Sequence, residues 1–118
     1  MRSVSRLQSF GHAFRGVRVL LGQANARIHV AVAVLVLLLG GYFHIAALEW
    51  ALLALAITLV IGAEALNTAL ELAVDLVSPE WHALARDAKD VAAAGVLVTS
   101  MGALAVGLLI FGPRVLPG

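Results

Sequence analysis

The chain has 118 residues, of which 62% are hydrophobic and only 13% are charged, and its formal net charge is +1. A soluble domain usually carries about 25% charged residues, so a chain this short and apolar has too little polar surface to remain in water. The absence of cysteine excludes a disulfide framework and a thiolate site. We therefore predict a single membrane domain over residues 1–118.

Residues 6–22 are predicted to form an amphipathic helix, because apolar side chains recur there at steps of three and four. These side chains are Leu7, Phe10, Phe14, Val17 and Leu21. An apolar face opposite arginines is typical of a helix that lies in the membrane interface. The alternative is a helix packed on the rest of the protein. The segment has no continuous apolar core, which argues against a secretory signal peptide.

Three further segments are predicted to be transmembrane helices, at residues 25–44, 48–77 and 88–112. The predicted fold class is thus an all-α membrane protein with three spans and an N-terminal interfacial helix. The second helix would be roughly 45 Å long at 1.5 Å per residue, whereas the hydrocarbon core is roughly 30 Å thick. Its second, more polar half is therefore expected to leave the membrane on one side.

The distribution of Lys and Arg predicts the orientation. Five arginines precede or begin the first span, at Arg2, Arg6, Arg15, Arg18 and Arg27. The second connection adds Arg86 and Lys89, whereas the first connection has no Lys or Arg and the C-terminal tail has only Arg114. We therefore expect the N-terminus and the second connection to be cytoplasmic, and the C-terminus to lie outside.

Four polar residues of the second helix recur at i, i+3, i+7 and i+11: Glu64, Asn67, Glu71 and Asp75. At 100° per residue they lie within a narrow arc of one helix face. Glu64 lies roughly 24 Å along the axis from Leu48, near the cytoplasmic end of the hydrocarbon core. A base at this depth can meet the polar head of a lipid, while the outer acids remain accessible to a soluble compound.

Lys89 and Asp90, at the start of the third span, complement this acidic stripe. Carboxylates suit Mg²⁺, and lysine binds phosphate as a point charge, so the set fits a metal–polyphosphate complex. Each residue also has a simpler interpretation. Glu64 alone is equally well explained by an ion pair with an arginine of a neighbouring helix. Asn67 could form a hydrogen bond between helices, and His82 could be a surface residue. Asp75 and Asp90 could be ordinary interfacial charges.

No glycine-rich nucleotide motif is present, so the residues alone leave several functions open. A transporter or ion-conducting subunit would place ionisable groups at the middle of the bilayer, and the middle of all three predicted spans is free of charge. A non-enzymatic assembly subunit would explain the small residues of the third span but not the acidic stripe. Phosphoryl transfer would use the stripe and Lys89 together.

The run from Glu64 to Asp90 contains the pattern E-x-x-N-[ST]-A-x-E-x-x-x-D, followed by His82 and Lys89-Asp90. This pattern and the three-span layout closely resemble the prokaryotic diacylglycerol kinase family, which includes the undecaprenol kinases. The resemblance covers essentially the whole chain. It implies a homotrimer with active sites shared between subunits and phosphorylation of a lipid hydroxyl by MgATP, with no nucleic-acid partner. It also implies a bacterial plasma membrane location.

The resemblance implies a role for each matching residue. Glu64 would be the catalytic base and Glu71 a metal ligand. The nucleotide contacts would be Asn67, Asp75, His82, Lys89, Asp90 and, by the nearest alignment at the N-terminus, Arg6. Gln23 departs from the family pattern, because many relatives have a metal-binding glutamate there; glutamine keeps the oxygen ligand but loses the charge.

The identity of the lipid rests on the resemblance alone. The Ile28-His29 pair and the residues 77–80 look more like the undecaprenol kinases than the diacylglycerol kinases. Undecaprenol is therefore the favoured substrate and diacylglycerol the alternative.

Overall fold

The computed structural model describes residues 5–116, which form four helices and no strand. The helices are α1 (Arg6–Leu21), α2 (Ala24–Phe43), α3 (Ala47–Val77) and α4 (Ala83–Val115). α2, α3 and α4 are each long and apolar enough to cross a membrane. The prediction of an all-helical protein with three candidate spans is therefore confirmed.

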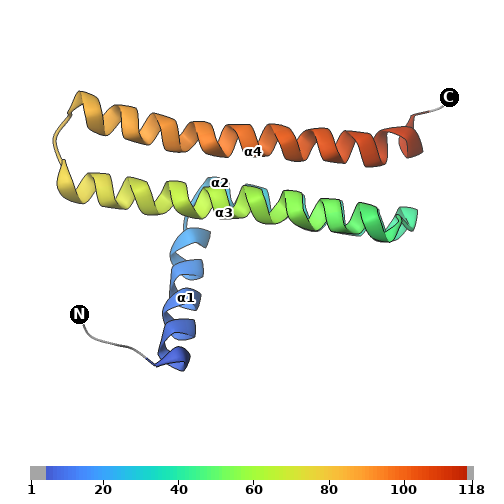
Figure 1. Ribbon diagram of the computed structural model, residues 1–118, viewed down its shortest axis with the longest axis horizontal. Helices are drawn as coiled ribbons and strands as arrows, with labels where there is room; N and C mark the ends of the chain where they lie inside the picture. The colour runs from blue at the N-terminus through green and yellow to red at the C-terminus, as the bar shows by residue number, and fades with distance from the viewer. Residues whose placement is uncertain (1–4, 117–118) are drawn as a thin grey trace.

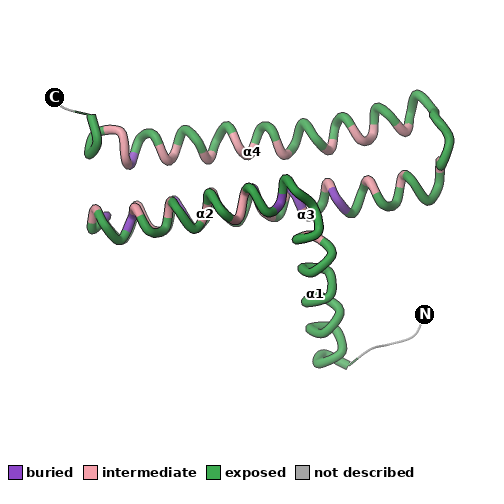
Figure 2. The backbone as a smooth tube through the Cα atoms, turned by 180° about the vertical axis from the view of Figure 1, so that it is seen from behind, coloured by how far each residue is buried: buried purple, intermediate pink, exposed green. Residues whose placement is uncertain are grey.

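The three long helices form an elongated bundle with α3 at its centre (Figure 1). α4 runs antiparallel to α3, α2 packs along the first part of α3, and α1 projects crosswise from the start of α2. The molecule measures 55 × 39 × 20 Å along its principal axes. Half of the buried residues among 5–116 lie on α3, more than on any other helix, and they include Leu53, Val60 and Glu64 (Figure 2). α3 is thus the helix on which the others pack.

A capping box sets the start of α1. The Ser5 hydroxyl accepts a hydrogen bond from the Gln8 amide at 3.2 Å, and the Gln8 side-chain oxygen accepts one from the Ser5 amide at 3.1 Å. The helix ends at Leu21, one residue before the predicted end. Its apolar side chains Leu7, Phe10 and Phe14 are exposed in the single chain. The location of α1 at a membrane interface remains a prediction.

The helix α4 extends beyond the predicted third span, residues 88–112, at both ends. α4 begins at Ala83, because His82 caps it: the Leu84 amide donates to His82 Nδ1 at 3.0 Å. The connection between α3 and α4 is therefore only residues 78–82, and Lys89 lies inside the helix. α4 also continues past Pro113 to Val115, since a proline in the last turns removes only one backbone donor.

An ion pair joins α3 and α4 at the end opposite this connection. Both terminal nitrogens of Arg114 donate to the carboxylate of Glu49, at 2.7 and 2.8 Å. Glu49 also accepts from the Ala46 amide at the start of α3, at 2.9 Å. Beside this pair lies the main apolar cluster, whose buried members are Ile45, Leu53 and Ile110. The pair was not predicted, because its partners are 65 residues apart.

The turn between α2 and α3 depends on a close approach at Gly40. A Cβ atom there would lie 2.6 Å from Cη2 of Trp50 and 3.1 Å from Cδ1 of Ile45. The next residue, Gly41, has nothing within 4 Å of the same position. The two neighbouring glycines therefore form a matched pair for testing the packing of this turn.

We expect Gly40→Ala to destabilise the protein by about 1–3 kcal/mol, because overpacking displaces Trp50 and Ile45. Gly41→Ala should be neutral or slightly stabilising, since alanine loses less conformational freedom than glycine on folding. Thermal unfolding in detergent, followed by the helical circular dichroism signal, measures both. Equal midpoints for the two variants would contradict this packing.

Candidate active site

The four residues of the acidic stripe lie on α3 and become more exposed along it. Glu64 is buried, with 3% of its surface exposed, Asn67 and Glu71 are half-buried, and Asp75 is exposed. Eleven residues at 1.5 Å each separate the first from the last by about 16 Å. The stripe therefore runs from a buried carboxylate to groups that a soluble compound can reach.

The buried carboxylate of Glu64 faces a histidine of α2. Nδ1 of His29 lies 3.2 Å from Oε2 of Glu64, within hydrogen-bond distance but without hydrogen-bond geometry. Ala26, one turn before His29, is also buried, so its small side chain lets α2 approach closely. Within the described residues of the single chain, the basic side chain beside Glu64 is thus a histidine, and no arginine is paired with it there.

Asn67 and Glu71 interact one turn apart on α3. Nδ2 of Asn67 donates to Oε1 of Glu71 at 3.5 Å, a long hydrogen bond. Oδ1 of Asn67 is buried and has no hydrogen-bond partner. The amide therefore orients the Glu71 carboxylate and leaves one oxygen acceptor free beside it.

The outer end of the stripe is joined to α4. Nζ of Lys89 forms a salt bridge with Oδ1 of Asp75, because the antiparallel packing brings the first turns of α4 beside the last turns of α3. A cavity of about 280 Å³ adjoins this pair, lined also by Asp90, Arg86 and residues 78–82. A cation beside carboxylates at the edge of a polar cavity is suited to bind a phosphate chain together with its metal.

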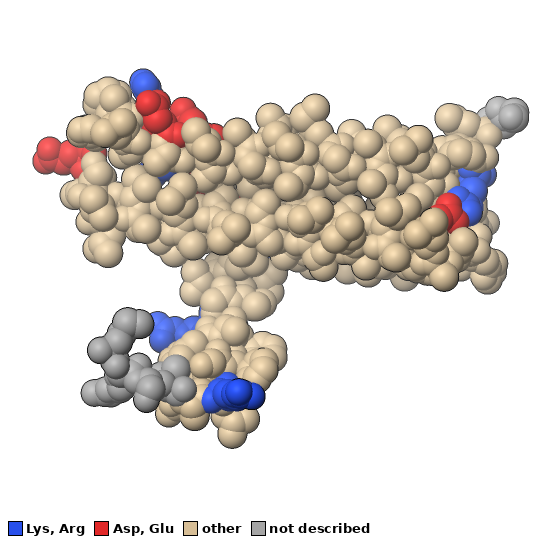
Figure 3. Space-filling view, viewed as in Figure 1, with Lys and Arg blue, Asp and Glu red and all other residues tan. Residues whose placement is uncertain are grey.

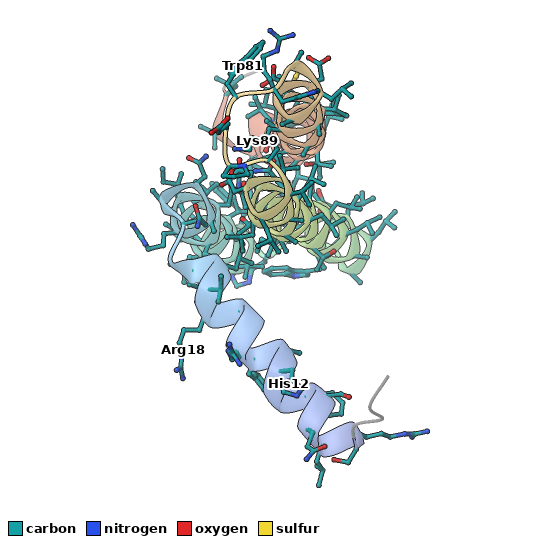
Figure 4. All side chains as sticks on the ribbon, turned by 90° about the vertical axis from the view of Figure 1, so that its left-hand side faces the viewer. His12, Arg18, Trp81 and Lys89 are labelled. Atoms are coloured by element: carbon teal, nitrogen blue, oxygen red, sulfur yellow. The ribbon has the colours of Figure 1, made fainter. Side chains whose placement is uncertain are left out.

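Charged side chains are concentrated away from the middle of the bundle. Figure 3 shows the acids around the α3–α4 connection, the bases of α1, and the Glu49–Arg114 pair at the opposite end. Figure 4 looks along the bundle from the connection and places Lys89 between α3 and α4, with Trp81 close by. The visible face of the middle section carries neither acid nor base, as expected for a part that contacts lipid tails.

The remaining predicted site residues lie apart from one another. His82 caps α4 and lines the cavity. Gln23 is the N-cap residue of α2, exposed and without a side-chain capping hydrogen bond. Arg6 is the first residue of α1, whose N-terminal end lies far from the bundle in Figures 1 and 4. A single chain does not bring Arg6 to the cavity.

The donor atoms suit a hard cation only in part. Within residues 5–116, no group of three or more His, Cys, Asp and Glu residues is close enough to hold a metal ion. The free Oδ1 of Asn67 and the carboxylate of Glu71 are nevertheless adjacent oxygen donors, which Mg²⁺ prefers. One chain thus supplies two adjacent oxygen donors of the kind that Mg²⁺ prefers.

Sequence reasoning missed the structural roles of two histidines, the contact of His29 with Glu64 and the capping of α4 by His82. His29 was used only as part of a family resemblance, and His82 was not expected to cap a helix. An isolated titratable side chain within an apolar segment was the available signal for His29, because such residues are costly in a membrane and usually have a partner.

Comparison with known proteins finds sequence relatives over most of the chain. A family model described as prokaryotic diacylglycerol kinase matches residues 11–111. Undecaprenol kinase of Bacillus subtilis is 39% identical over 108 residues, covering 91% of this chain and 88% of that protein. Diacylglycerol kinase of Synechocystis is 44% identical over 103 residues, covering 86% of this chain but 59% of that protein. Diacylglycerol kinase of Escherichia coli K12 is 29% identical over 93 residues, covering 78% and 76%.

Three apolar helices, a buried acid and a cation beside outer acids, together with these relatives, define a membrane lipid kinase that uses ATP. The chain belongs to the prokaryotic diacylglycerol kinase family. The resemblance inferred from the Glu64–Asp90 pattern is therefore confirmed.

Proposed function

We propose that the chain transfers the γ-phosphoryl group of MgATP to the hydroxyl of undecaprenol, with Glu64 as the general base. The observation that carries this proposal is the burial of Glu64 between two different environments. On one side, His29 borders an apolar groove of about 400 Å³ between α2, α3 and α4. On the other, the stripe leads to the polar cavity at Asp75 and Lys89. In this proposal the lipid alcohol approaches along the groove beside His29, and the nucleotide along the stripe from the cavity.

The chemistry requires little covalent participation by the protein. Glu64 accepts the proton of the lipid hydroxyl as its oxygen bonds to the γ-phosphorus. The bond from that phosphorus to the bridging oxygen breaks, and ADP leaves. Lys89 neutralises phosphate charge, and Asp75, His82, Asp90 and Arg6 are the further proposed nucleotide contacts.

Bound Mg²⁺ would neutralise charge on the phosphate oxygens. Glu71 and Oδ1 of Asn67 are the donors proposed to hold it, with Gln23 as a further, neutral oxygen ligand. The orientation of Glu71 by Asn67 supports this set.

Two lipids are supported by relatives. The undecaprenol kinase aligns over most of both chains, at 91% and 88%. The more identical Synechocystis protein, a diacylglycerol kinase, is matched over only 59% of its length. We favour undecaprenol because the alignment with the undecaprenol kinase covers nearly the full length of both proteins. Diacylglycerol is the second candidate.

The proposal predicts ATP-dependent phosphate transfer to undecaprenol in detergent micelles, faster than to diacylglycerol. Glu64→Gln should lower kcat by about 10²–10⁴-fold, because it keeps the shape of the side chain but removes the base. ATP affinity should be retained, since the proposed nucleotide contacts are other residues, at the outer end of α3, on α4 and on α1. Radiolabelled phosphate transfer measures kcat, and titration measures ATP binding. Near-normal turnover in the variant would remove Glu64 from the role of base.

Gln23→Glu tests the metal proposal. The added charge should lower the Mg²⁺ concentration for half-maximal activity, whereas Glu71→Gln should raise it sharply, because carboxylates bind Mg²⁺ more strongly than amides. Activity measured across a Mg²⁺ titration reports both effects. An unchanged Mg²⁺ dependence in both variants would place the metal elsewhere.

We further propose a bacterial plasma membrane location, with the N-terminus and active site cytoplasmic and the C-terminus outside. The crosswise direction of α1 supports its lying along the inner surface, beside the level where α2 begins. The arginines Arg15 and Arg18 of α1 and Lys89 of α4 support the cytoplasmic side. Arg2, also used in this prediction, lies outside the described residues.

Cysteines at Ala46 and Ala83 test this orientation, because both residues are exposed and the chain has no native cysteine. A membrane-impermeant thiol reagent should label the Ala46 position from outside the cell. The Ala83 position should react only in inverted vesicles. Labelling of both positions from one side would contradict the orientation.

A homotrimer with shared active sites is also proposed. It is supported by the large apolar side chains exposed along all the helices, and by the distance of the start of α1 from the bundle. Another subunit would then supply Arg6.

Light scattering with detergent correction should give the mass of three chains. Inactive Glu64→Ala and Lys89→Ala subunits should partly restore activity when mixed, since a shared site can take one intact residue from each. Verified mixed trimers without recovered activity would indicate a site within one chain.

A further inference from the structure

We infer that His29 is a positioning residue for Glu64, holding one carboxylate oxygen so that the other accepts the proton of the lipid hydroxyl. This inference rests on the proposed role of Glu64 as general base. It assigns to α2 the positioning of the base, whereas the acidic stripe lies entirely on α3.

The contact joins two atoms that have no other partner. Nδ1 of His29 and Oε2 of Glu64 are both fully buried and make no hydrogen bond, although they lie 3.2 Å apart. A rotation of the ring that aligned its N–H with the carboxylate would satisfy both atoms. Burying a charged group without a partner is costly, so this alignment is strongly favoured when Glu64 is ionised.

Other basic groups do not compete for Glu64. Among residues 5–116, His29 alone brings a basic nitrogen within 4.0 Å of that carboxylate, because Lys89, Arg86 and Arg114 are paired with other acids. The glutamate side chain is 4% exposed and that of His29 is 24% exposed. A hydrogen bond in such a poorly hydrated place is stronger than one in water.

Only one oxygen of Glu64, Oε2, is both fully buried and unpartnered. Binding of Oε2 by the ring fixes the plane of the carboxylate and leaves Oε1 for the substrate. A misplaced base loses much of its effect, since catalysis requires the reacting atoms in a narrow range of positions. His29 therefore acts on turnover through Glu64.

The test compares three replacements of His29 in the full-length protein. The amide nitrogen of asparagine can occupy the place of Nδ1, whereas that of glutamine extends one bond further and leucine has no donor. We expect His29→Leu and His29→Gln to lower kcat about ten- to a hundredfold, the effect of one hydrogen bond to a charged group. His29→Asn should remain within about threefold of the wild type. The KM for ATP should stay unchanged, because the nucleotide contacts lie elsewhere.

The same replacements in a Glu64→Gln background show whether His29 acts through Glu64. There His29→Leu should cause no further loss of kcat, because two residues that act as one unit are not additive. His12→Gln, a histidine replacement on α1, should leave kcat unchanged. Thermal unfolding of each variant separates lost turnover from lost folding.

Three results would overturn the inference while leaving the base role of Glu64 intact. The first is a normal kcat for His29→Leu when Glu64→Gln is inactive. The second is an equal loss of kcat in His29→Asn and His29→Leu. The third is a further loss of kcat when His29→Leu is added to Glu64→Gln. Normal turnover of Glu64→Gln itself would instead reject the proposed base and, with it, the positioning role.

Discussion

A carboxylate buried among apolar helices is stable only if another group is brought to it, and this requirement links the helices of the protein. Glu64 is 3% exposed and lies on α3, whose own sequence offers no basic residue. His29 of α2 approaches it at 3.2 Å. The packing of α2 on α3 therefore places a histidine where its ring N–H, once aligned with the carboxylate, would offset the cost of burying the charge. The position of α2 in turn sets where α1 leaves the bundle.

Because the helices differ in length, one helix, α3, has a part that can contact lipid and a part that can reach water. α2 has 20 residues, or about 30 Å, which matches the hydrocarbon core, whereas α3 has 31 and extends further at about 1.5 Å per residue. The additional length of α3 carries Glu71 and Asp75 beyond the N-terminal end of α2. α4, with 33 residues, accompanies α3 over this extension and supplies Lys89. Helices of one length would leave no protein surface for a soluble nucleotide.

The charged groups that join α3 and α4 are placed at the two ends of the bundle. Asp75 pairs with Lys89 near the connection, and Glu49 pairs with Arg114 at the other end. The Glu49 carboxylate is bound by both terminal nitrogens of the guanidinium, a geometry with more directional specificity than a single contact. The two ion pairs thus hold α3 and α4 in the same antiparallel register at both ends of the bundle. The proposed nucleotide site, assembled around the Asp75–Lys89 pair, would need no glycine-rich loop.

The amino-acid sequence by itself determined the three apolar helices and the acidic stripe, because hydrophobic length and the 3.6-residue period are local properties of the chain. It also carried the pattern from Glu64 to Asp90 that identifies the family. The local sequence pattern could not show that His82 caps α4. Because of this cap the helix begins at Ala83, before the predicted start of the third span at residue 88. Only the tertiary structure decided that Glu64 faces His29 and that Glu49 faces Arg114. These pairs depend on the rotation and depth at which separate helices pack, and both are set by contacts between segments far apart in the chain.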